Sequence, residues 1–347
     1  MNEPIHSATD DPSTSSSTAP PGIFIGPEGL RPFWGLLLYL AILLTPLLLF
    51  LLAAHLAHHG TPAQHASQEQ PPFPMLIREW LLFGFVFFAT WIMSRIEHRS
   101  VFDYGLPRVP QRWRWLIVGA VLGVLFQSLL ILMLWSTHHL VFAGFLLRPS
   151  AGLAYGLLWG VGFVGVGFFE EFLFRGYLQF NLTRCFAGLV RSIAPTSRNA
   201  EAIGFWVAAA FISFGFGLVH GSNPGESPIG LLCAGAAGLM FAFTLWRTGS
   251  LWWAIGLHAG WDWAQSFFFG VADSGGVSAH RLLATHPVGS TLLSGGLTGP
   301  EGSLFVFPVM VAITIVAALT LPRRPASLQL WTNTETQLAA TVHSAHE

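Results

Sequence analysis

Ionisable side chains that could carry acid–base chemistry occur at three places inside otherwise apolar stretches of the sequence. They are Glu170, Glu171, Arg175, His220, His258 and Asp262. A charged group at the centre of a bilayer costs at least about 2.5–3.5 kcal/mol, so such groups are functional candidates by default. Glutamate and histidine together supply what activation of a water molecule needs, a proton acceptor and an orienting or ligating imidazole. The set therefore predicts hydrolytic chemistry within a membrane.

The first group is the run from Glu170 to Arg175. Glu171 and Arg175 are four residues apart, so on a helix they share one face and can form an ion pair. Glu170 points about 100° away from Glu171, because successive helical residues advance by that angle. We expect the pair to hold the helix in register and to leave Glu170 available for chemistry. A purely structural bridge, with Glu170 facing a water-filled cavity, is the alternative.

The other two groups are weaker when each is taken alone. His220 ends an apolar stretch, where a single histidine is usually interfacial. His258 and Asp262 are spaced for one helix face, so the carboxylate can orient the ring or share a ligand site. That pair could equally be a polar clasp between helices. Together with Glu170, however, these residues supply a base, two imidazoles and a second acid.

The elements that must position these residues are membrane-spanning helices. The chain is 52% hydrophobic and 10% charged, against about 25% charged in an average soluble domain. A helix needs about 20 apolar residues to cross the hydrocarbon layer. Eight such runs are present, at about 33–57, 76–94, 115–135, 152–181, 201–220, 229–247, 251–271 and 303–321. The sequence therefore predicts an all-α, polytopic transmembrane bundle of about eight helices.

The segments outside this bundle are polar. Residues 1–30 are rich in Ser, Thr and Pro and are predicted to be a disordered tail, while 323–347 is predicted to be mobile. The transmembrane domain would span 31–322. The net charge of −1 indicates no nucleic-acid partner. Two cysteines, Cys185 and Cys233, are too few for a disulfide framework.

The arginines are distributed unevenly between the two sides of the predicted bundle. Positively charged residues gather in cytoplasmic loops of membrane proteins. With the N-terminus inside, the cytoplasmic segments hold twelve arginines: Arg31, Arg95, Arg99, Arg108, Arg112, Arg114, Arg184, Arg191, Arg198, Arg247, Arg323 and Arg324. The external segments hold three: Arg78, Arg148 and Arg281. This predicts that both termini are cytoplasmic, and it supports eight spans because a missed helix would scramble the alternation.

The predicted topology raises a difficulty about depth. A helix that starts near Glu201 would place His220 about 28 Å along its axis, near the external face. His258 would lie about two turns from the cytoplasmic side. Convergence of the two histidines needs helix tilt, a later helix start or an irregular cavity near Gly215, and an interfacial stretch at 184–206 could also supply it.

The three groups together resemble the motifs of the CAAX prenyl protease and bacteriocin-processing (CPBP) family of intramembrane endopeptidases. That family carries Glu-Glu-x-x-x-Arg, Phe-x-x-x-His and His-x-x-x-Asn helices. Here they correspond to Glu170-Glu171-x-x-x-Arg175, Phe216-x-x-x-His220 and His258-x-x-x-Asp262. The resemblance covers about residues 155–270 and implies a membrane-embedded peptidase.

One position departs from the family pattern. Asp262 stands where the prenyl-protease branch has Asn, whose amide can donate to an oxyanion, whereas an ionised carboxylate cannot. Asp262 is therefore either protonated or orients His258 instead. The resemblance is compatible with a metal-free mechanism, and it is also compatible with one Zn²⁺ ligated by Glu170, His220 and His258.

The sequence predicts an intramembrane endopeptidase, CAAX-protease-like, that acts on a membrane-associated protein or peptide. Glu170 and His220 would activate a water, while His258, helped by Asp262, would stabilise the oxyanion or position that water. A proton-coupled transporter and a non-catalytic scaffold or immunity protein are the alternatives. The bilayer and a protein substrate, lipidated or not, are the expected partners. The short tails favour a bacterial plasma membrane.

Overall fold

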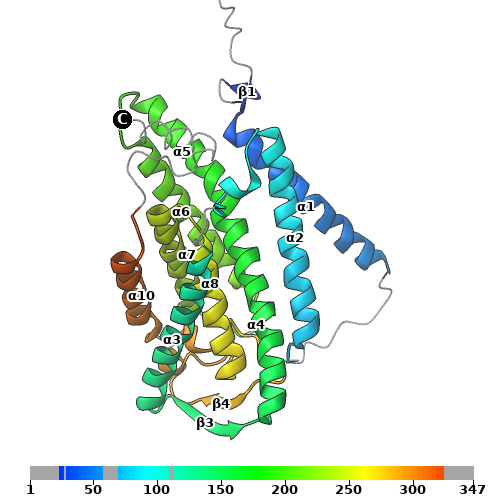
Figure 1. Cartoon of the computed structure of the whole chain (residues 1–347), viewed down its shortest axis with the longest axis vertical. Coiled ribbons are helices and arrows are strands. Elements are labelled where there is room, and N and C mark those ends of the chain that lie inside the picture. The colour runs from blue at the N-terminus through cyan, green and yellow to red at the C-terminus, as the bar shows by residue number, and fades with distance from the viewer. Residues whose placement is uncertain (1–22, 27–28, 58–68, 109–112, 324–347) are drawn as a thin grey trace, which may run out of the picture.

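The computed structural model describes residues 23–26, 29–57, 69–108 and 113–323. Within them the chain is a bundle of long helices (Figure 1). The helices are α1 Pro32–Ala57, α2 Pro72–Ile96, α3 Arg114–Ser136, α4 Pro149–Glu171, α5 Gln179–Ile193, α6 Ala200–His220, α7 Pro228–Thr248, α8 Trp252–Asp262, the short α9 Thr291–Ser294 and α10 Val306–Thr320. The prediction of an all-α bundle is confirmed.

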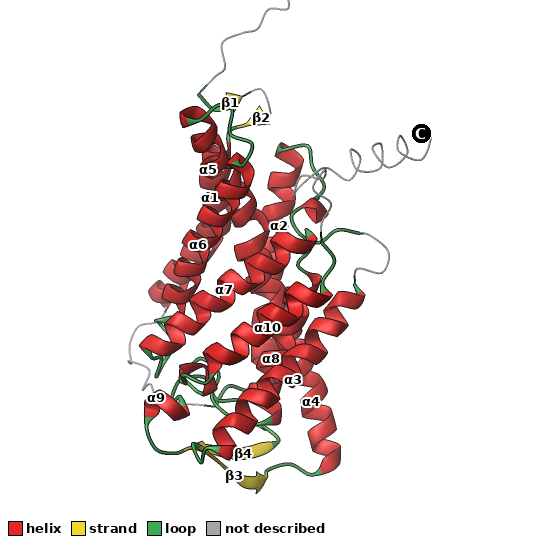
Figure 2. Cartoon of the chain, turned by 90° about the vertical axis from the view of Figure 1, so that its left-hand side faces the viewer, coloured by secondary structure: helices red, strands yellow, loops and turns green. Residues whose placement is uncertain are grey.

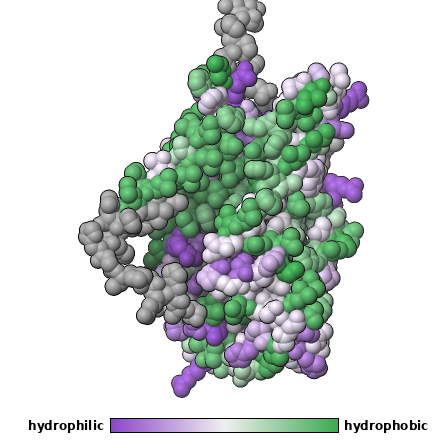
Figure 3. Space-filling model, turned by 180° about the vertical axis from the view of Figure 1, so that it is seen from behind, coloured by the Kyte–Doolittle hydropathy of each residue, from purple (hydrophilic) through white to green (hydrophobic). Residues whose placement is uncertain are grey.

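Each of the eight predicted apolar runs is helical in the described residues. Five helical segments are long and apolar enough to cross a membrane by length and composition, and these are Pro72–Ile96, Arg114–Ser136, Pro149–Ile193, Ala200–His220 and Pro228–Thr248. Many large apolar side chains point outward from them, among them Leu81, Phe85 and Leu125. Figure 3 shows the broad apolar surface that results. The chain is an integral membrane protein, and the orientation of its termini stays a prediction.

The predicted tails fall almost wholly outside the described residues. Of the segment 1–30, the part that is described forms a small antiparallel pair, with β1 Ile25–Gly26 against β2 Gly29–Leu30. Of the segment 323–347, only Arg323 is described.

The two ends of the bundle differ in structure. At one end, β3 Leu140–Phe145 pairs antiparallel with β4 Leu283–Pro287, and we call this the sheet end (Figures 1 and 2). The opposite end carries the start of α1 and the end of α5 (Figure 1), and we call it the arginine end because the ten described arginines of the predicted cytoplasmic segments belong to it. Chain connections at the two ends therefore correspond to the two predicted sides of the membrane.

Helix α8 lies at the centre of the bundle because glycines let its neighbours approach closely. A Cβ on Gly256 or Gly260 would overlap the backbone of α3 at Leu116 or Ala120. Small residues four apart allow this kind of backbone contact between membrane helices. Residues two positions away lie about 200° around the helix. The α3 contact therefore turns His258 and Asp262 toward the opposite face of α8.

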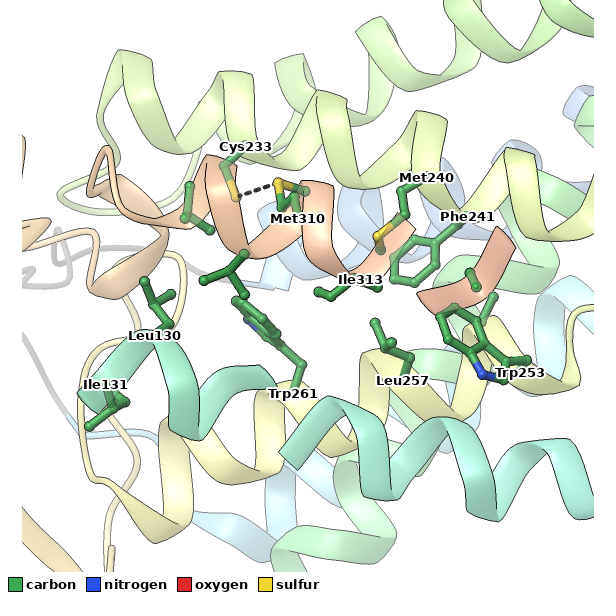
Figure 4. Packing of buried hydrophobic residues seen from close by; sticks show 14 of the residues in the cluster. Leu130, Ile131, Cys233, Met240, Phe241, Trp253, Leu257, Trp261, Met310 and Ile313 are labelled. Atoms are coloured by element: carbon green, nitrogen blue, oxygen red, sulfur yellow. Dashed lines mark hydrogen bonds between the residues drawn. The ribbon is translucent and has the colours of Figure 1, made fainter. Parts of the chain in front are cut away.

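Two large apolar clusters fill the bundle. One lies toward the arginine end and contains Tyr39, Tyr104, Phe172, Tyr177, Leu245, Leu251 and Ile255, all of them buried. The other joins α3, α7, α8 and α10 and includes the side chains labelled in Figure 4, among them Cys233, Phe241, Leu257 and Met310. The Sγ atom of Cys233 lies 3.9 Å from the Sδ atom of Met310 (Figure 4).

Candidate active site

Glu171 and Arg175 form the ion pair that their spacing predicts. Nη1 of Arg175 donates to Oε1 of Glu171 at 3.1 Å, and both side chains are fully buried. The guanidinium also lies over the ring of Phe216 on α6, 4.4 Å from its centroid. A buried pair of this kind neutralises each charge and ties α4 to α6.

His258 joins this pair from α8. Its Nδ1 atom lies 3.1 Å from Oε1 of Glu171, the same oxygen that accepts from Arg175. Because Glu171 can only accept when ionised, the Nδ1–H of His258 is the donor. The residue that fixes the imidazole ring through a hydrogen bond is therefore Glu171, whereas the i+4 spacing had suggested Asp262.

Glu170 and Asp262 flank the other ring nitrogen of His258. Nε2 lies 3.7 Å from Oε2 of Glu170 and 3.6 Å from Oδ2 of Asp262. Both distances are longer than a hydrogen bond. Oε2 of Glu170 is buried without a hydrogen-bond partner in the described residues. Two carboxylates and one imidazole nitrogen thus converge without bonding directly to one another.

His220 reaches the level of this group because α5 and α6 form a helical hairpin. Gly204, near the start of α6, packs against Thr183 and Ala187 of α5. Further along α6, the ring of Phe216 contacts that of Phe174. His220 lies one turn beyond Phe216, just as Glu170 and Glu171 lie about one turn before Arg175 on the antiparallel helix. The predicted difficulty about depth is resolved by this pairing.

The orientation of His220 is set by its own helix. Nδ1 lies 2.7 Å from the carbonyl oxygen of Phe216, so the Nδ1–H donates to that carbonyl. The neutral ring then presents an unprotonated Nε2 atom, which can accept a proton or a hydrogen bond.

Both motif helices change geometry directly after their ionisable residues. A π-helical turn, η2 Phe172–Leu178, follows Glu171, and another, η3 Trp263–Phe268, follows Asp262. Gly176 within η2 has φ −82° and ψ −109°, which is not helical. Insertions of this kind inside α-helices are frequent at functional sites. Here they redirect α4 into α5 and α8 into the loop that follows it.

A single cavity of about 1000 Å³ contains these groups. Glu170, His220, His258 and Asp262 line it, whereas Glu171 and Arg175 lie behind its wall. The wall is partly apolar, from side chains of α7, α8 and α10 that include Met240, Phe241, Leu257, Met310 and Ile313 (Figure 4). Such a cavity combines an apolar surface with a few convergent polar groups, as binding sites for small or extended ligands do.

Three further acids line the cavity that the sequence patterns did not single out. Glu79 on α2 is bound by Arg78, whose Nε atom lies 2.7 Å from its Oε1. Asp273 accepts a hydrogen bond from Ser266, and Glu301 accepts from Trp261 and Ser274. Glu79 lies near the start of the predicted span 76–94, and the loop that holds Asp273 and Glu301 has no periodic pattern. Sequence spacing alone gave no signal for them.

The environment of Asp273 favours its protonated form. Burial, and after it the nearby negative charge of Glu301, raise the pKa of this carboxyl to about 8. Asp273 lies outside the membrane-spanning helices, in the loop after η3. The cavity wall near the sheet end therefore holds a carboxyl group that takes up or releases a proton close to neutral pH.

The predicted zinc ligands do not form a ligand set in this arrangement. Within the described parts of the chain, no three His, Cys, Asp or Glu side chains are grouped closely enough to hold a metal ion. We therefore derive no chemical step through zinc.

The segment that holds this site matches the model of a known family. Residues 152–264 match the model of the Rce1-like family, type II CAAX prenyl endopeptidase Rce1-like. The Rce1-like segment contains all six ionisable residues of the motifs and runs from α4 into η3. Comparisons with curated proteins and with solved structures give no match.

The Rce1-like match confirms the resemblance to CAAX-type peptidases that the three motifs indicated. At the level of the family, it supports an intramembrane protease that acts on a protein substrate. The helices outside the matched segment, α1 to α3 and α10, supply the remainder of the bundle.

Proposed function

We propose that this chain is an intramembrane endopeptidase that hydrolyses a peptide bond of a membrane-associated protein or peptide. The observation that carries the proposal is the convergence of Glu170, His220, His258 and Asp262 on one cavity within the Rce1-like segment. Glu170 has a buried oxygen that makes no hydrogen bond with a described residue. Oε2 of Glu171 is also buried without a partner in the described residues, but Oε1 of Glu171 accepts from Arg175 and His258. Glu170 makes no hydrogen bond with any described residue, as expected of a general base that binds a water.

In the proposed reaction, Glu170 accepts a proton from a water held between it and Nε2 of His220. The water oxygen attacks the scissile carbonyl carbon, and the carbonyl oxygen becomes an oxyanion. The proton then passes from Glu170 to the amide nitrogen as the carbon–nitrogen bond breaks. A carboxylic acid and an amine are the products, so no other reactant is consumed.

His258 would stabilise the oxyanion through the hydrogen on Nε2. Glu171 accepts from Nδ1 at 3.1 Å and keeps the ring in place, so Nε2–H can point toward the space between Glu170 and Asp262. A preorganised donor of this kind contributes about 2.7–4 kcal/mol to transition-state stabilisation in other hydrolases. Asp262 would favour the protonated ring by its negative charge.

The test is cleavage of a peptide library by the full chain reconstituted in proteoliposomes. We expect Glu170→Gln to lower the cleavage rate by about 10²–10⁴-fold, since the amide cannot accept the proton. Glu69→Gln is the matched control, because Glu69 is half exposed near the cavity and its ion pair among the described residues is with Arg281. Equal rates in all three proteins, or no cleavage by folded wild type, would contradict the proposal.

The same assay addresses the metal and the competing functions. Activity that survives chelation would indicate a metal-free mechanism, and activity that returns only with zinc would place a metal in it. A transporter would lose substrate flux on Glu170→Gln and cleave nothing. A scaffold would keep partner binding in the same variant.

A further inference from the structure

The described loops that line the cavity all lie at the sheet end of the bundle. Beside the helices, its lining comes from Gln70 before α2, from 222–224 between α6 and α7, and from 273–277 and Glu301 between η3 and α10. The loops at the arginine end run through 97–108, 194–199, 249–251 and 321–323 as far as they are described. None of the residues in those ranges lines the cavity.

The arginine end is closed by a packed apolar cluster. Phe172 follows Glu171 directly, and Ile255 lies one turn before His258, so both are on the arginine side of the ionisable group. Together with Leu245 and Leu251 they are fully buried and belong to one continuous cluster. Fully buried apolar side chains in one continuous cluster leave no passage for a peptide. The arginine end therefore gives no route to the candidate site, whereas the loops that line the cavity lie at the sheet end.

The polar contacts of this closed end reinforce it. Glu97, at the end of α2, accepts hydrogen bonds from Tyr104 at 2.7 Å and from Tyr177 at 2.8 Å. The ring of Tyr177 in turn lies 4.4 Å from that of Tyr39 on α1. Three helical segments and the α2–α3 loop are thereby joined at one place.

The sequence identifies which side of the membrane each end faces. Ten described arginines belong to the segments at the arginine end and three to those at the sheet end, while Arg112 and Arg324 fall outside the described residues. An excess of this kind in short loops marks the cytoplasmic side. Acidic residues have little influence on orientation, so Asp273 and Glu301 at the sheet end do not weaken the assignment.

We infer that the substrate enters this cavity from the non-cytoplasmic side of the membrane. The substrate class is then a peptide segment that has already been exported or that is anchored with its cleavage site on that face. The statement that the entering peptide is a substrate rests on the proposed function. The direction of access follows from the cavity, the apolar closure and the arginine distribution.

Two exposed serines provide a matched pair for testing it. Ser222 follows the end of α6 at the cavity mouth, and Ser192 lies near the end of α5 at the arginine end. Each hydroxyl donates to the carbonyl of the residue three positions earlier, Val219 and Leu189 respectively. Ser222→Cys and Ser192→Cys therefore perturb equivalent local structure on opposite faces.

The variants would be made in a background with Cys185→Ser and Cys233→Ala, and a membrane-impermeant maleimide would be applied to intact spheroplasts expressing the full chain. We expect the Cys variant at 222 to label to the level seen after permeabilisation, and the one at 192 to label only after permeabilisation. The reverse result, or equal labelling of both in intact spheroplasts, would overturn the inference. If Cys233→Ala impairs folding, Cys233 can be kept, and the protein without an introduced cysteine then gives the background labelling, because Cys233 itself lines the cavity.

A second experiment tests whether a label at the cavity mouth slows cleavage. In proteoliposomes, a bulky maleimide on the 222 variant should slow cleavage strongly, and the same label on the 192 variant should not. Unchanged cleavage after complete labelling at 222 would show that substrate does not pass this mouth. The labelling arm requires no cleavage, so a failure of the proposed peptidase activity is separable from a failure of the access inference.

Discussion

Two glutamates, one at the arginine end of the bundle and one in the cavity, have different surroundings. Glu97, at the arginine end, accepts hydrogen bonds from Tyr104 and Tyr177. Glu170, in the cavity, has His258 Nε2 at 3.7 Å and no hydrogen bond to a described residue. Buried polar groups in folded proteins are usually paired, so an unpaired one calls for an explanation such as catalysis or an absent ligand. The contrast separates a carboxylate that supports the fold from one available for chemistry.

Glu171 connects the two kinds of region. It is paired with Arg175, as a structural carboxylate would be, and it also holds His258, which faces the cavity. Adjacent residues in the chain thus have different functions because the helix directs them to different neighbours. Glu171 is therefore better described as the residue that positions His258 than as a group that contacts substrate.

The largest effect is expected from breaking the buried pair. Arg175→Met would leave Glu171 buried with only His258 as a partner, and loss of one member of a buried ion pair costs about 3–5 kcal/mol. Thermal unfolding in detergent measures this loss. Glu69→Gln, which breaks the more exposed pair with Arg281, should cost less than about 1 kcal/mol. Similar unfolding temperatures for the two variants would mean that the Glu171–Arg175 pair is not structural.

A smaller effect is expected from one substitution at the arginine end, beside Glu97, and one in the cavity, beside Glu170. Tyr177→Phe removes one hydrogen bond to Glu97 and should lower stability by about 1.5–3 kcal/mol, as for other bonds to charged groups. Asp262→Asn, in the cavity, removes no hydrogen bond and should change stability little. It also introduces the amide found in the prenyl-protease branch, so cleavage should stay within about tenfold of wild type. If Asp262→Asn lowers stability more than Tyr177→Phe does, the contrast between the arginine end and the cavity is contradicted.

The remaining effect concerns pH. Because the pKa of Asp273 is raised to about 8, the folded protein holds a proton that the unfolded chain has lost above about pH 4. The contribution of this group is fully favourable below about pH 4 and is lost as the pH rises toward 8. Asp273→Asn should therefore gain stability relative to wild type between pH 5 and about pH 8. Parallel stability curves for the two proteins over that range would contradict the assigned environment.

Local spacing was sufficient to predict the helices and the contacts within them. The apolar runs are helical at each predicted position, and Glu171 and Arg175 pair as their four-residue separation requires. Such predictions succeed because the helical period is a local property of the backbone. Spacing also indicated that His258 and Asp262 share a face, and the two side chains lie 3.6 Å apart.

Contacts between elements distant in the sequence could not be read from spacing. The partner that fixes His258 is Glu171, 87 positions away, and the depth of His220 depends on how α6 packs against α5. Glu79, Asp273 and Glu301 reach the cavity from three further segments. Sequence by itself therefore determined a membrane bundle with a Glu–His peptidase motif. The tertiary structure decided which carboxylates are hydrogen-bonded, which are not and which loops line the cavity, because packing between helices sets those distances.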